Sequence, residues 1–481
     1  METKQVLSEK KKRIIVYLAA VLVVFIWLPL SITKAVAYDQ AYTTAMVRHS
    51  FGEIVTLCSY DVHSPLYYFI AKIFYHLCFN HIFGLKVCSL FFMGIYLWML
   101  AVPFRKEFGN RMAFSMIVLS GVLPTFLTHN TEPRMYTMAI SAYAAVAFLA
   151  YKIIKRFQMK YAVLFFFASV FAVYIHTYTM IATVLLYLVL MVASFVKKEE
   201  RKKRIAWFFI NGVLVSVSYL PWLFALMSQF GTKGEVAKPQ FDVAFYIDEI
   251  LNESFSSIMY PKKWQTAIWL VILAFSLVIL IVKKTPYWKE ILTGAGIFVL
   301  VSALGVYLSV SYSPCFMGRY VTCIMPLILF AVAAALDLVK PKWIVAAILL
   351  LAVMGGALVY RDRVRYEYEK GLDNYLEYAK NTYKEEDAVI YADIHSNYLS
   401  VFTPDVYTYI LGRKDEFNPY DNDEIFADPA QADDVKGDLY FICLNDKNPD
   451  WFIVCNYEQV YGFHYLYYDF AVYKINFQTQ E

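Results

Sequence analysis

The sequence predicts an α-helical polytopic membrane protein of about eleven transmembrane helices, followed by a small extracytoplasmic α/β domain. Three observations lead to this fold class. Of the 481 residues, 59% are apolar, 18% aromatic and only 17% charged, so most of the chain cannot form the surface of a water-soluble globule. The apolar residues are gathered in runs of about 20, the length that crosses a bilayer as a helix. Short basic clusters separate these runs, as is typical of cytoplasmic helix ends.

The first apolar run, residues 14–32, is predicted to be a retained anchor that enters the membrane from the cytoplasm. The basic stretch KQVLSEKKKR precedes it, and such stretches mark the cytoplasmic side. No small-residue cleavage site follows the run and many more apolar runs do, which argues against a cleaved signal peptide. The chain therefore emerges outside near Thr33, and residues 33–63 are expected to form the first external loop.

Basic clusters fix the rest of the topology. Those expected to be cytoplasmic are residues 104–111, 151–160, 197–204, 283–290 and 339–342. Helices that alternate between them return the chain outside at residues 127–136, 174–179, 227–262 and 311–320. The last helix, residues 343–360, exits outside. The chain is thus predicted to have a transmembrane domain in residues 1–360 and an extracytoplasmic domain in residues 361–481.

One apolar segment, residues 64–80, does not fit this alternation. If it crossed the membrane, the basic cluster around Arg105 would lie outside. The segment is short and carries Lys72 and His76, so we expect it to lie in the outer interface or to dip partway into the membrane. A full crossing that violates the positive-inside tendency is the alternative.

The last 121 residues, 361–481, have the pattern of a mixed α/β domain. Residues 375–383 favour a helix, whereas residues 387–393, 438–445 and 469–477 are short stretches rich in β-branched and aromatic side chains. In the large external loop, residues 241–254 are amphipathic. They are expected either to lie on the membrane and cover a cavity or to be an ordinary connecting helix.

Ionisable side chains gather in the segments that this topology places outside. They are Asp39, Arg48, His49, Asp61, His63, His129, Glu132, Arg134, His176 and Arg319. Any one of them could be an interfacial side chain that reaches water. The whole group is harder to explain in that way, because ionisable residues at the membrane edge are costly and usually functional.

Carboxylates and arginines at the external lipid boundary suit a reaction whose activated donor arrives within the membrane. There is no pool of ATP or nucleotide sugar outside a cell, and the chain has neither a Gly-rich phosphate loop nor a dinucleotide fingerprint. A polyprenyl-phosphate sugar fits, since an arginine can neutralise the leaving phosphate and a carboxylate can accept the proton of the acceptor hydroxyl. No nucleic-acid partner is expected, because the basic residues follow the topology.

Four motifs carry a resemblance to a known family. In chain order they are YDQAYT (38–43), DVHSPLYY (61–68), EPRMYT (132–137) and PCFMGRYVTCIMPLILF (314–330). Their order and spacing resemble those of the GT-C class of polytopic glycosyltransferases, specifically the bacterial relatives of protein O-mannosyltransferases and of the lipid A aminoarabinose transferase. The resemblance extends to about residue 340, and it implies a GT-C-like membrane domain.

The resemblance implies roles for individual residues. Asp39 corresponds to the catalytic acidic residue after the first span and would be the general base. Arg319 and Tyr320 fall on the Arg-Tyr pair expected to face the lipid phosphate, and Asp61, His63, Arg134 and Tyr136 fall on the other motifs. With Glu132 and His176 from the external ionisable group, the expected substrate-binding residues are Asp61, His63, Glu132, Arg134, Tyr136, His176, Arg319 and Tyr320.

Two departures from the family pattern affect what can be carried over. Relatives commonly have Asp-Glu after the first span, but Gln40 follows Asp39 here, and Ser64 replaces the first proline of the usual Pro-Pro pair. The loss of the second acid leaves any metal site in that loop in doubt. No cofactor is predicted, and a divalent metal is left open.

The predicted function is transfer of a hexose or pentose from a polyprenyl-phosphate-linked donor to a lipid, wall-polymer or protein acceptor on the outer face of the plasma membrane, with inversion. A polyprenyl-linked glycan ligase or polymerase is a close alternative, because it needs a similar cavity. A lipid or solute transporter is the alternative from another class. Transporters often have internal repeats and mid-membrane charges, and this sequence has neither pattern.

Overall fold

The computed structural model describes residues 2–61, 63–232, 241–256, 263–312, 315–391, 394–403, 407–411, 420, 423–425, 435–445, 455–466 and 468–477. The chain divides into two compact units, which are considered separately below. The first unit comprises Met1–Ile32 and Val62–Arg363, and the second comprises Thr33–Asp61 and Val364–Glu481.

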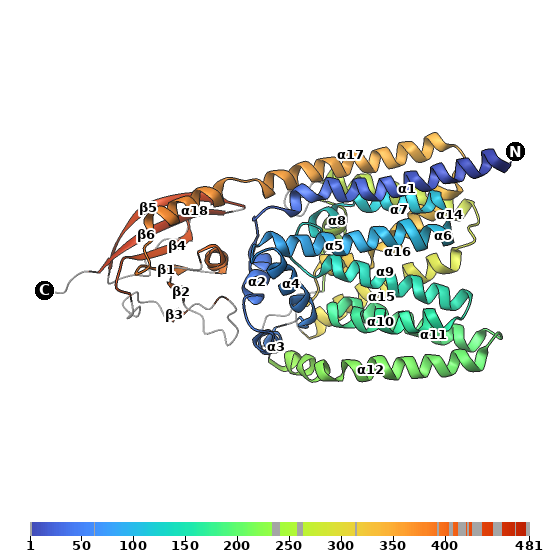
Figure 1. Cartoon of the computed structure of the whole chain (residues 1–481), viewed down its shortest axis with the longest axis horizontal. Helices are drawn as coiled ribbons and strands as arrows, with labels where there is room; N and C mark the ends of the chain where they lie inside the picture. Colours follow the sequence, from blue (N-terminus) through green and yellow to red (C-terminus); the bar gives the residue numbers. More distant parts are fainter. Residues whose placement is uncertain are drawn as a thin grey trace. The chain divides into compact units, whose positions relative to one another are not determined.

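The first unit is a bundle of helices, most of which run nearly side by side along their long axes (Figure 1). Their bounds are α1 (Glu2–Ser31), α4 (Leu66–Leu77), α5 (Phe83–Met99), η1 (Leu100–Phe104), α6 (Arg105–Phe108), α7 (Asn110–Val122), α8 (Pro124–His129), α9 (Tyr136–Lys155), α10 (Met159–Ile175), α11 (Thr177–Val196), α12 (Arg201–Thr232), α13 (Val243–Phe255), α14 (Lys263–Val282), α15 (Trp288–Ser311), η2 (Gly318–Ile324), α16 (Met325–Leu338) and α17 (Lys342–Glu367).

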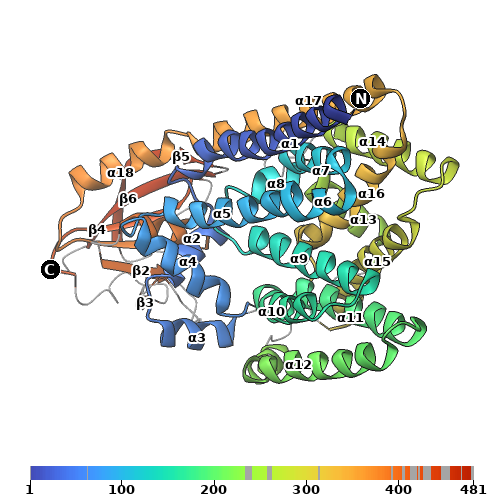
Figure 2. The ribbon, with the colours of Figure 1, turned by 45° about the vertical axis from the view of Figure 1, so that its right-hand side comes forward.

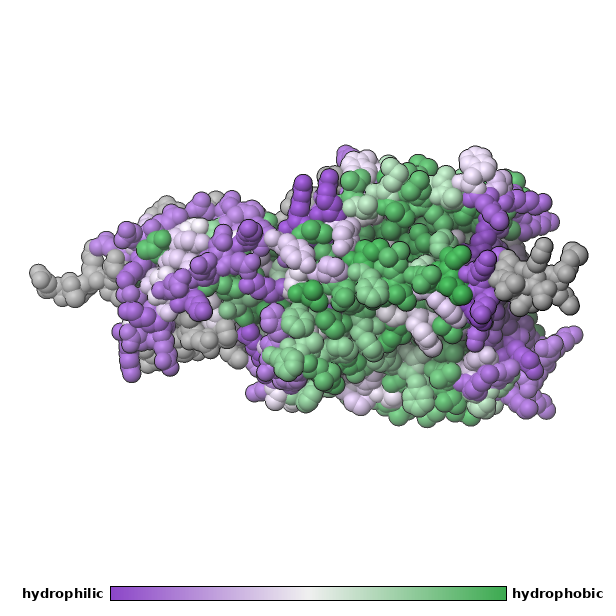
Figure 3. Space-filling view, turned by 45° about the horizontal axis from the view of Figure 1, so that its top comes forward, coloured by the Kyte–Doolittle hydropathy of each residue, from purple (hydrophilic) through white to green (hydrophobic). Residues whose placement is uncertain are grey.

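The bundle confirms the predicted class of multi-pass membrane protein. Within the described residues, nine helices are long and apolar enough to cross a membrane. Figure 3 shows the apolar side chains as a broad band, with hydrophilic residues gathered at the end of the bundle where the N-terminus and α6 lie. Long helices that expose apolar side chains in this way are stable only in lipid. The nine are Glu9–Ser31, Phe83–Phe108, Tyr136–Lys155, Thr177–Val196, Arg201–Met227, Lys263–Val282, Trp288–Ser311, Gly318–Leu338 and Lys342–Thr382.

Two of the expected spans are shorter than the rest. The third corresponds to α7, with 13 residues, and the fifth to α10, with 17. The helix α7 ends because Pro124 follows Leu123, and a residue before proline is pushed out of the helical region into the extended one. A second short helix, α8, then continues to His129. The count of eleven spans stays a prediction.

The segment that did not fit the alternation forms the separate helix α4. It has 12 residues, or about 18 Å at 1.5 Å per residue, which is too short for a hydrocarbon core of about 30 Å. After it, Phe79 and Asn80 take positive φ angles of 58° and 60° and turn the chain into α5, against which α4 packs (Figure 2). The length of α4 therefore favours a partial dip or an interfacial position over a full crossing.

The second unit is a mixed α/β structure, as the sequence predicted. Its six-stranded sheet has the order β3-β2-β1-β4-β6-β5, in which the first four strands in this order are parallel and the last two are antiparallel to their neighbours. The strands are β1 (Ala388–Tyr391), β2 (Tyr407–Leu411), β3 (Asp423–Ile425), β4 (Leu439–Leu444), β5 (Cys455–Tyr465) and β6 (Tyr468–Phe477), and the helices are α2 (Tyr38–Met46), α3 (Phe51–Tyr60), α18 (Gly371–Thr382), α19 (Ile394–Asn397) and η3 (Tyr398–Phe402).

The expected first external loop packs with this sheet as part of the second unit. The hydroxyl of Tyr465, at the end of β5, accepts a hydrogen bond from the Val36 N–H (3.0 Å) and donates one to the Val36 carbonyl (2.9 Å). Arg48 also donates to the Val401 carbonyl (2.6 Å). Both Tyr465 and Val36 are fully buried, so these bonds anchor the backbone directly before α2.

The anchor can be tested with Tyr465→Phe. This change leaves both buried polar groups of Val36 without their partner, and we expect a loss of about 1–3 kcal/mol in the stability of the second unit. Thermal unfolding in detergent should shift down, and amide exchange of residues 36–40 should accelerate. The matched control is Tyr457→Phe, whose side chain on the same strand is 37% exposed. If exchange at residues 36–40 is the same in both variants, Tyr465 is not the anchor.

Candidate active site

A buried network follows α8 and forms the centre of the polar cluster in the first unit. The imidazole Nδ1 of His129 lies 2.8 Å from one carboxylate oxygen of Glu132. The other oxygen accepts from Arg363 (3.4 Å), which also donates through Nε to the Thr131 hydroxyl (2.7 Å). Arg363 and His129 are 2% and 1% exposed. The network therefore joins the turn after α8 to the end of the last long helix, α17.

The electrostatics of this network keep His129 neutral and Glu132 charged. Burial lowers the pKa of His129 and outweighs the opposing effect of its hydrogen bond to Glu132. Burial alone would raise the pKa of Glu132, but its hydrogen bond to His129 and the nearby charges of Arg363 and Arg319 hold it below its usual value. At neutral pH the imidazole thus donates its Nδ1–H to a carboxylate.

A second group, around His176, packs beside the first. Arg134, only 6% exposed, lies with its Nη2 3.0 Å from Nε2 of His63. The His63 and His176 rings are 6.3 Å apart, and the Tyr136 ring lies 5.8 Å from His176 and 4.2 Å from His129. The two groups therefore form one continuous cluster of imidazoles, phenols and guanidinium groups.

His176 is held neutral with a defined tautomer. It precedes α11, and its Nδ1 accepts the backbone N–H of Tyr178 (3.2 Å). Burial places its pKa well below the usual value, and the nearby charges of Arg134 and Arg319 lower it further. Because Nδ1 is an acceptor, the proton of the neutral ring is on Nε2, which leaves an N–H donor for the cluster.

The short helix η2 brings Arg319 and Tyr320 to the same cluster. The Tyr320 ring lies 5.3 Å from His176 and 5.0 Å from Tyr178, and the charge of Arg319 acts on His129, Glu132 and His176. The helix begins at Gly318, where a Cβ atom would lie 2.5 Å from the Glu249 carbonyl oxygen of α13. Only glycine permits this approach of α13 to η2.

Of the nine residues proposed from the sequence, the structure brings seven together in the first unit. These are His63, Glu132, Arg134, Tyr136, His176, Arg319 and Tyr320. Asp39 and Asp61 belong to the second unit. Asp39 lies in the first turn of α2, and Asp61 caps the C-terminus of α3. A pocket shared by Asp39 and Arg319 stays a prediction.

Several polar residues of this region were not singled out from the sequence. Arg363 follows the expected end of the last span, and Lys86 is fully buried in the first turn of α5. Glu249 and Glu253 lie one turn apart on α13. Their spacing of four residues was the available signal, because it places both carboxylates on one helix face.

No metal site is evident in the described ranges. Among these residues, no group of three or more His, Cys, Asp or Glu side chains is arranged to hold a metal ion.

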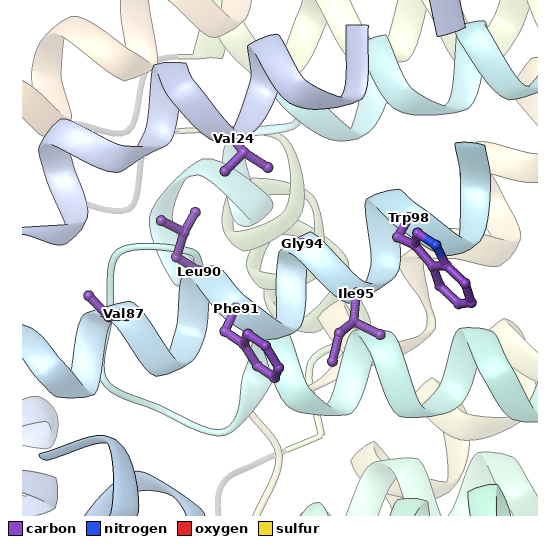
Figure 4. A pocket seen from close by; sticks show the side chains of 7 residues that line it. All are labelled: Val24, Val87, Leu90, Phe91, Gly94, Ile95 and Trp98. Carbon is purple, nitrogen blue, oxygen red and sulfur yellow. The ribbon is translucent and has the colours of Figure 1, made fainter. Parts of the chain in front are cut away.

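An apolar groove of about 440 Å³ lies between α1 and α5 (Figure 4). It is lined by Val24 of α1 and by Val87, Leu90, Phe91, Gly94, Ile95 and Trp98 of α5. None of these side chains can ionise, and Phe91 and Trp98 are more than half exposed on the apolar surface. The groove suits a hydrocarbon chain and not the polar steps of a reaction.

Comparison with known proteins identifies the fold. Searches of protein-family models and of curated proteins found no match. Among solved structures, the chain is similar to ArnT from Cupriavidus metallidurans in its apo state, with a TM-score of 0.66, 11% identity, and coverage of 95% of this chain and 97% of that one. It is also similar to the same protein bound to undecaprenyl phosphate, with a TM-score of 0.64, 10% identity and the same coverage. The chain therefore has the ArnT fold, which confirms the GT-C-like fold expected from the sequence.

The role of the Arg363 contacts can be tested with Arg363→Met. This change keeps much of the side-chain volume but leaves one oxygen of the Glu132 carboxylate without its cationic partner, and we expect a cost of about 3 kcal/mol or more. Thermal unfolding of the purified protein measures it. Arg365→Met, at an exposed position of the same helix, should have almost no effect. The double variant Arg363→Met/Glu132→Gln should recover part of the loss, and equal melting of the Arg363 and Arg365 variants would contradict the anchoring role.

Proposed function

We propose that this chain is a membrane glycosyltransferase that moves a sugar from a polyprenyl-phosphate-linked donor to an acceptor of the cell envelope, on the outer face of the membrane. The supporting observation is a cluster of arginines and neutral histidines in a chain with the ArnT fold. One of the similar ArnT structures is bound to undecaprenyl phosphate. A phosphate is the anion that guanidinium groups bind best.

Among the arginines of the cluster, Arg319 is the proposed contact to the donor phosphate. Arg134 and Arg363 are at least 94% buried and bound to His63 and to Thr131 and Glu132. Arg319 is partly exposed, so a lipid headgroup could reach it. Its planar guanidinium group can donate two parallel hydrogen bonds to phosphate oxygens, which matches the charge that develops on the leaving group.

The proposed reaction is a single displacement with inversion. The acceptor hydroxyl oxygen attacks the anomeric carbon from the side opposite the phosphate, while the carboxylate of Asp39 takes the hydroxyl proton. The bond between the anomeric carbon and the phosphate oxygen breaks, and its electron pair leaves with the polyprenyl phosphate. Arg319 and the buried charge of Arg134 stabilise the phosphate as this charge grows.

The base assignment is tested by Asp39→Asn, which keeps the shape of the side chain and removes its basicity. Loss of a general base costs about 10²- to 10⁴-fold in rate, so the variant should fail to restore the glycolipid or wall-polymer modification that a deletion strain lacks. Mass spectrometry of envelope extracts measures this. Glu53→Gln, an exposed carboxylate of the same segment, is the control. Full complementation by Asp39→Asn would refute the assignment.

The phosphate contact is tested by Arg319→Lys. Lysine keeps the charge but lacks the fork of donors, so binding of undecaprenyl phosphate to the purified protein in nanodiscs should weaken by about tenfold or more. Lys263→Arg, at an exposed position of α14, should bind as the wild type does. Unchanged binding in the Arg319 variant would exclude the proposed two-bond contact.

A further inference from the structure

The inner face of α13 presents two carboxylates to the turn that carries Arg319. One oxygen of Glu249 accepts the Gly318 N–H at 3.0 Å. One helical turn later, the Cβ of Glu253 is 3.1 Å from the position that a Cβ on Gly318 would occupy. The helix also packs on α8 and α14. Glu253 is thereby fixed directly beside the start of η2.

The two carboxylates are not equivalent. Glu249 is engaged with the backbone of η2. The Oε2 atom of Glu253 is buried and has no hydrogen-bond partner among the described residues. A buried carboxyl oxygen without a partner is destabilising, and a ligand that offers a hydrogen-bond partner at this position removes that cost.

The charges that face Glu253 come from three elements. Arg319 of η2 is the attractive one, and Glu132 after α8 and Glu249 on its own helix repel it. Burial raises the pKa of Glu253 to about 7, with Arg319 acting in the opposite direction. The other titratable or charged groups lie on the elements packed against this helix and on α13 itself. They are Tyr320 and Cys323 of η2, His129 of α8, Lys263 of α14, and Tyr246 and Asp248 of α13.

We propose that Glu253 is a donor-binding residue, which in its protonated form donates a hydrogen bond to a phosphate oxygen of the donor held by Arg319. This inference rests on the proposed function. When the carboxyl group of Glu253 is ionised, it competes with the donor phosphate for Arg319, and its negative charge repels the phosphate. The acid therefore makes donor binding depend on pH, whereas the arginines stay charged throughout.

The direction of the pH effect follows from linkage. Below about pH 7 Glu253 is already protonated in the free protein, and binding should not change with pH. Above about pH 7, Glu253 must take up a proton when the donor binds. The dissociation constant therefore increases with pH, and the increase approaches about tenfold per pH unit. Between pH 7 and pH 8.5 this amounts to roughly tenfold to twentyfold weaker binding.

The experiment measures binding of undecaprenyl methyl phosphate to the full-length protein in nanodiscs from pH 6 to pH 8.5. This probe is a phosphodiester with one fixed charge, so the ligand does not titrate in that range, unlike a phosphomonoester with its second pKa near 6. The wild type should lose affinity above about pH 7. Glu253→Gln, a permanent donor of the same shape, should bind with unchanged affinity at pH 6 and with no pH dependence. Asp248→Asn, exposed on the same helix, should retain the wild-type dependence.

Two further measurements distinguish an error in the role of Glu253 from an error in the proposed function. Glu253→Ala should bind more weakly than the wild type at pH 6 and without pH dependence, and titration calorimetry of the wild type in two buffers at pH 8 should show uptake of about one proton. If Glu253→Gln keeps the wild-type pH dependence of binding, or if the wild type takes up no proton, the inference about Glu253 is wrong. The proposed function still stands in that case, provided that binding depends on Arg319. Absence of binding at every pH would overturn the proposed function as well.

Discussion

The pairing of Glu132 with Arg363 is the constraint on which the candidate site depends. It joins the turn after α8 to the end of α17 inside a nearly water-free region, where a lone charge of either sign would be costly. Once this pair is satisfied, Glu132 can hold the His129 imidazole through Nδ1. His129 in turn packs against Tyr136 at 4.2 Å, and Tyr136 against His176. Each step fixes the orientation of the next ring, so one ion pair sets the geometry of a cluster drawn from segments far apart in the sequence.

The arginines and the buried histidines of the cluster differ in their charge state. Its arginines are charged at any relevant pH, and burial keeps His129 and His176 neutral. The positive potential of the guanidinium groups does not vanish when the pH rises through the usual range of histidine. A site that must hold a lipid phosphate gains from this arrangement, because its affinity is not tied to the titration of imidazoles. On this view, Glu253 is the titrating group that matters for donor binding.

The sequence was sufficient for features that depend on local patterns and insufficient for those that depend on tertiary pairing. Apolar runs bounded by basic clusters located the long apolar helices of the described residues, and the concentration of ionisable residues in external segments pointed to Glu132, Arg134 and Arg319. Arg363 was missed because α17 continues past the apolar run, and Lys86 because one lysine in a span does not reveal whether it is buried. The amphipathic pattern of α13 was recognised, but such a pattern does not say which face points inward. The hydrogen bonds between Tyr465 and Val36 join a side chain to a backbone 429 residues away, and no sequence pattern encodes a backbone partner.

Asp39 and Glu253 are proposed to act in opposite protonation states, and their environments differ accordingly. A base must be ionised, and Asp39 lies partly exposed in the first turn of α2, where helix N–H groups favour negative charge. An acid that donates to phosphate must be protonated, and Glu253 lies beside two other carboxylates with a buried oxygen. The base is carried by a segment that the C-terminal sheet anchors through Tyr465, while the acid is carried by a helix that docks on η2 through Gly318. Each carboxylate is thus supported within its own unit.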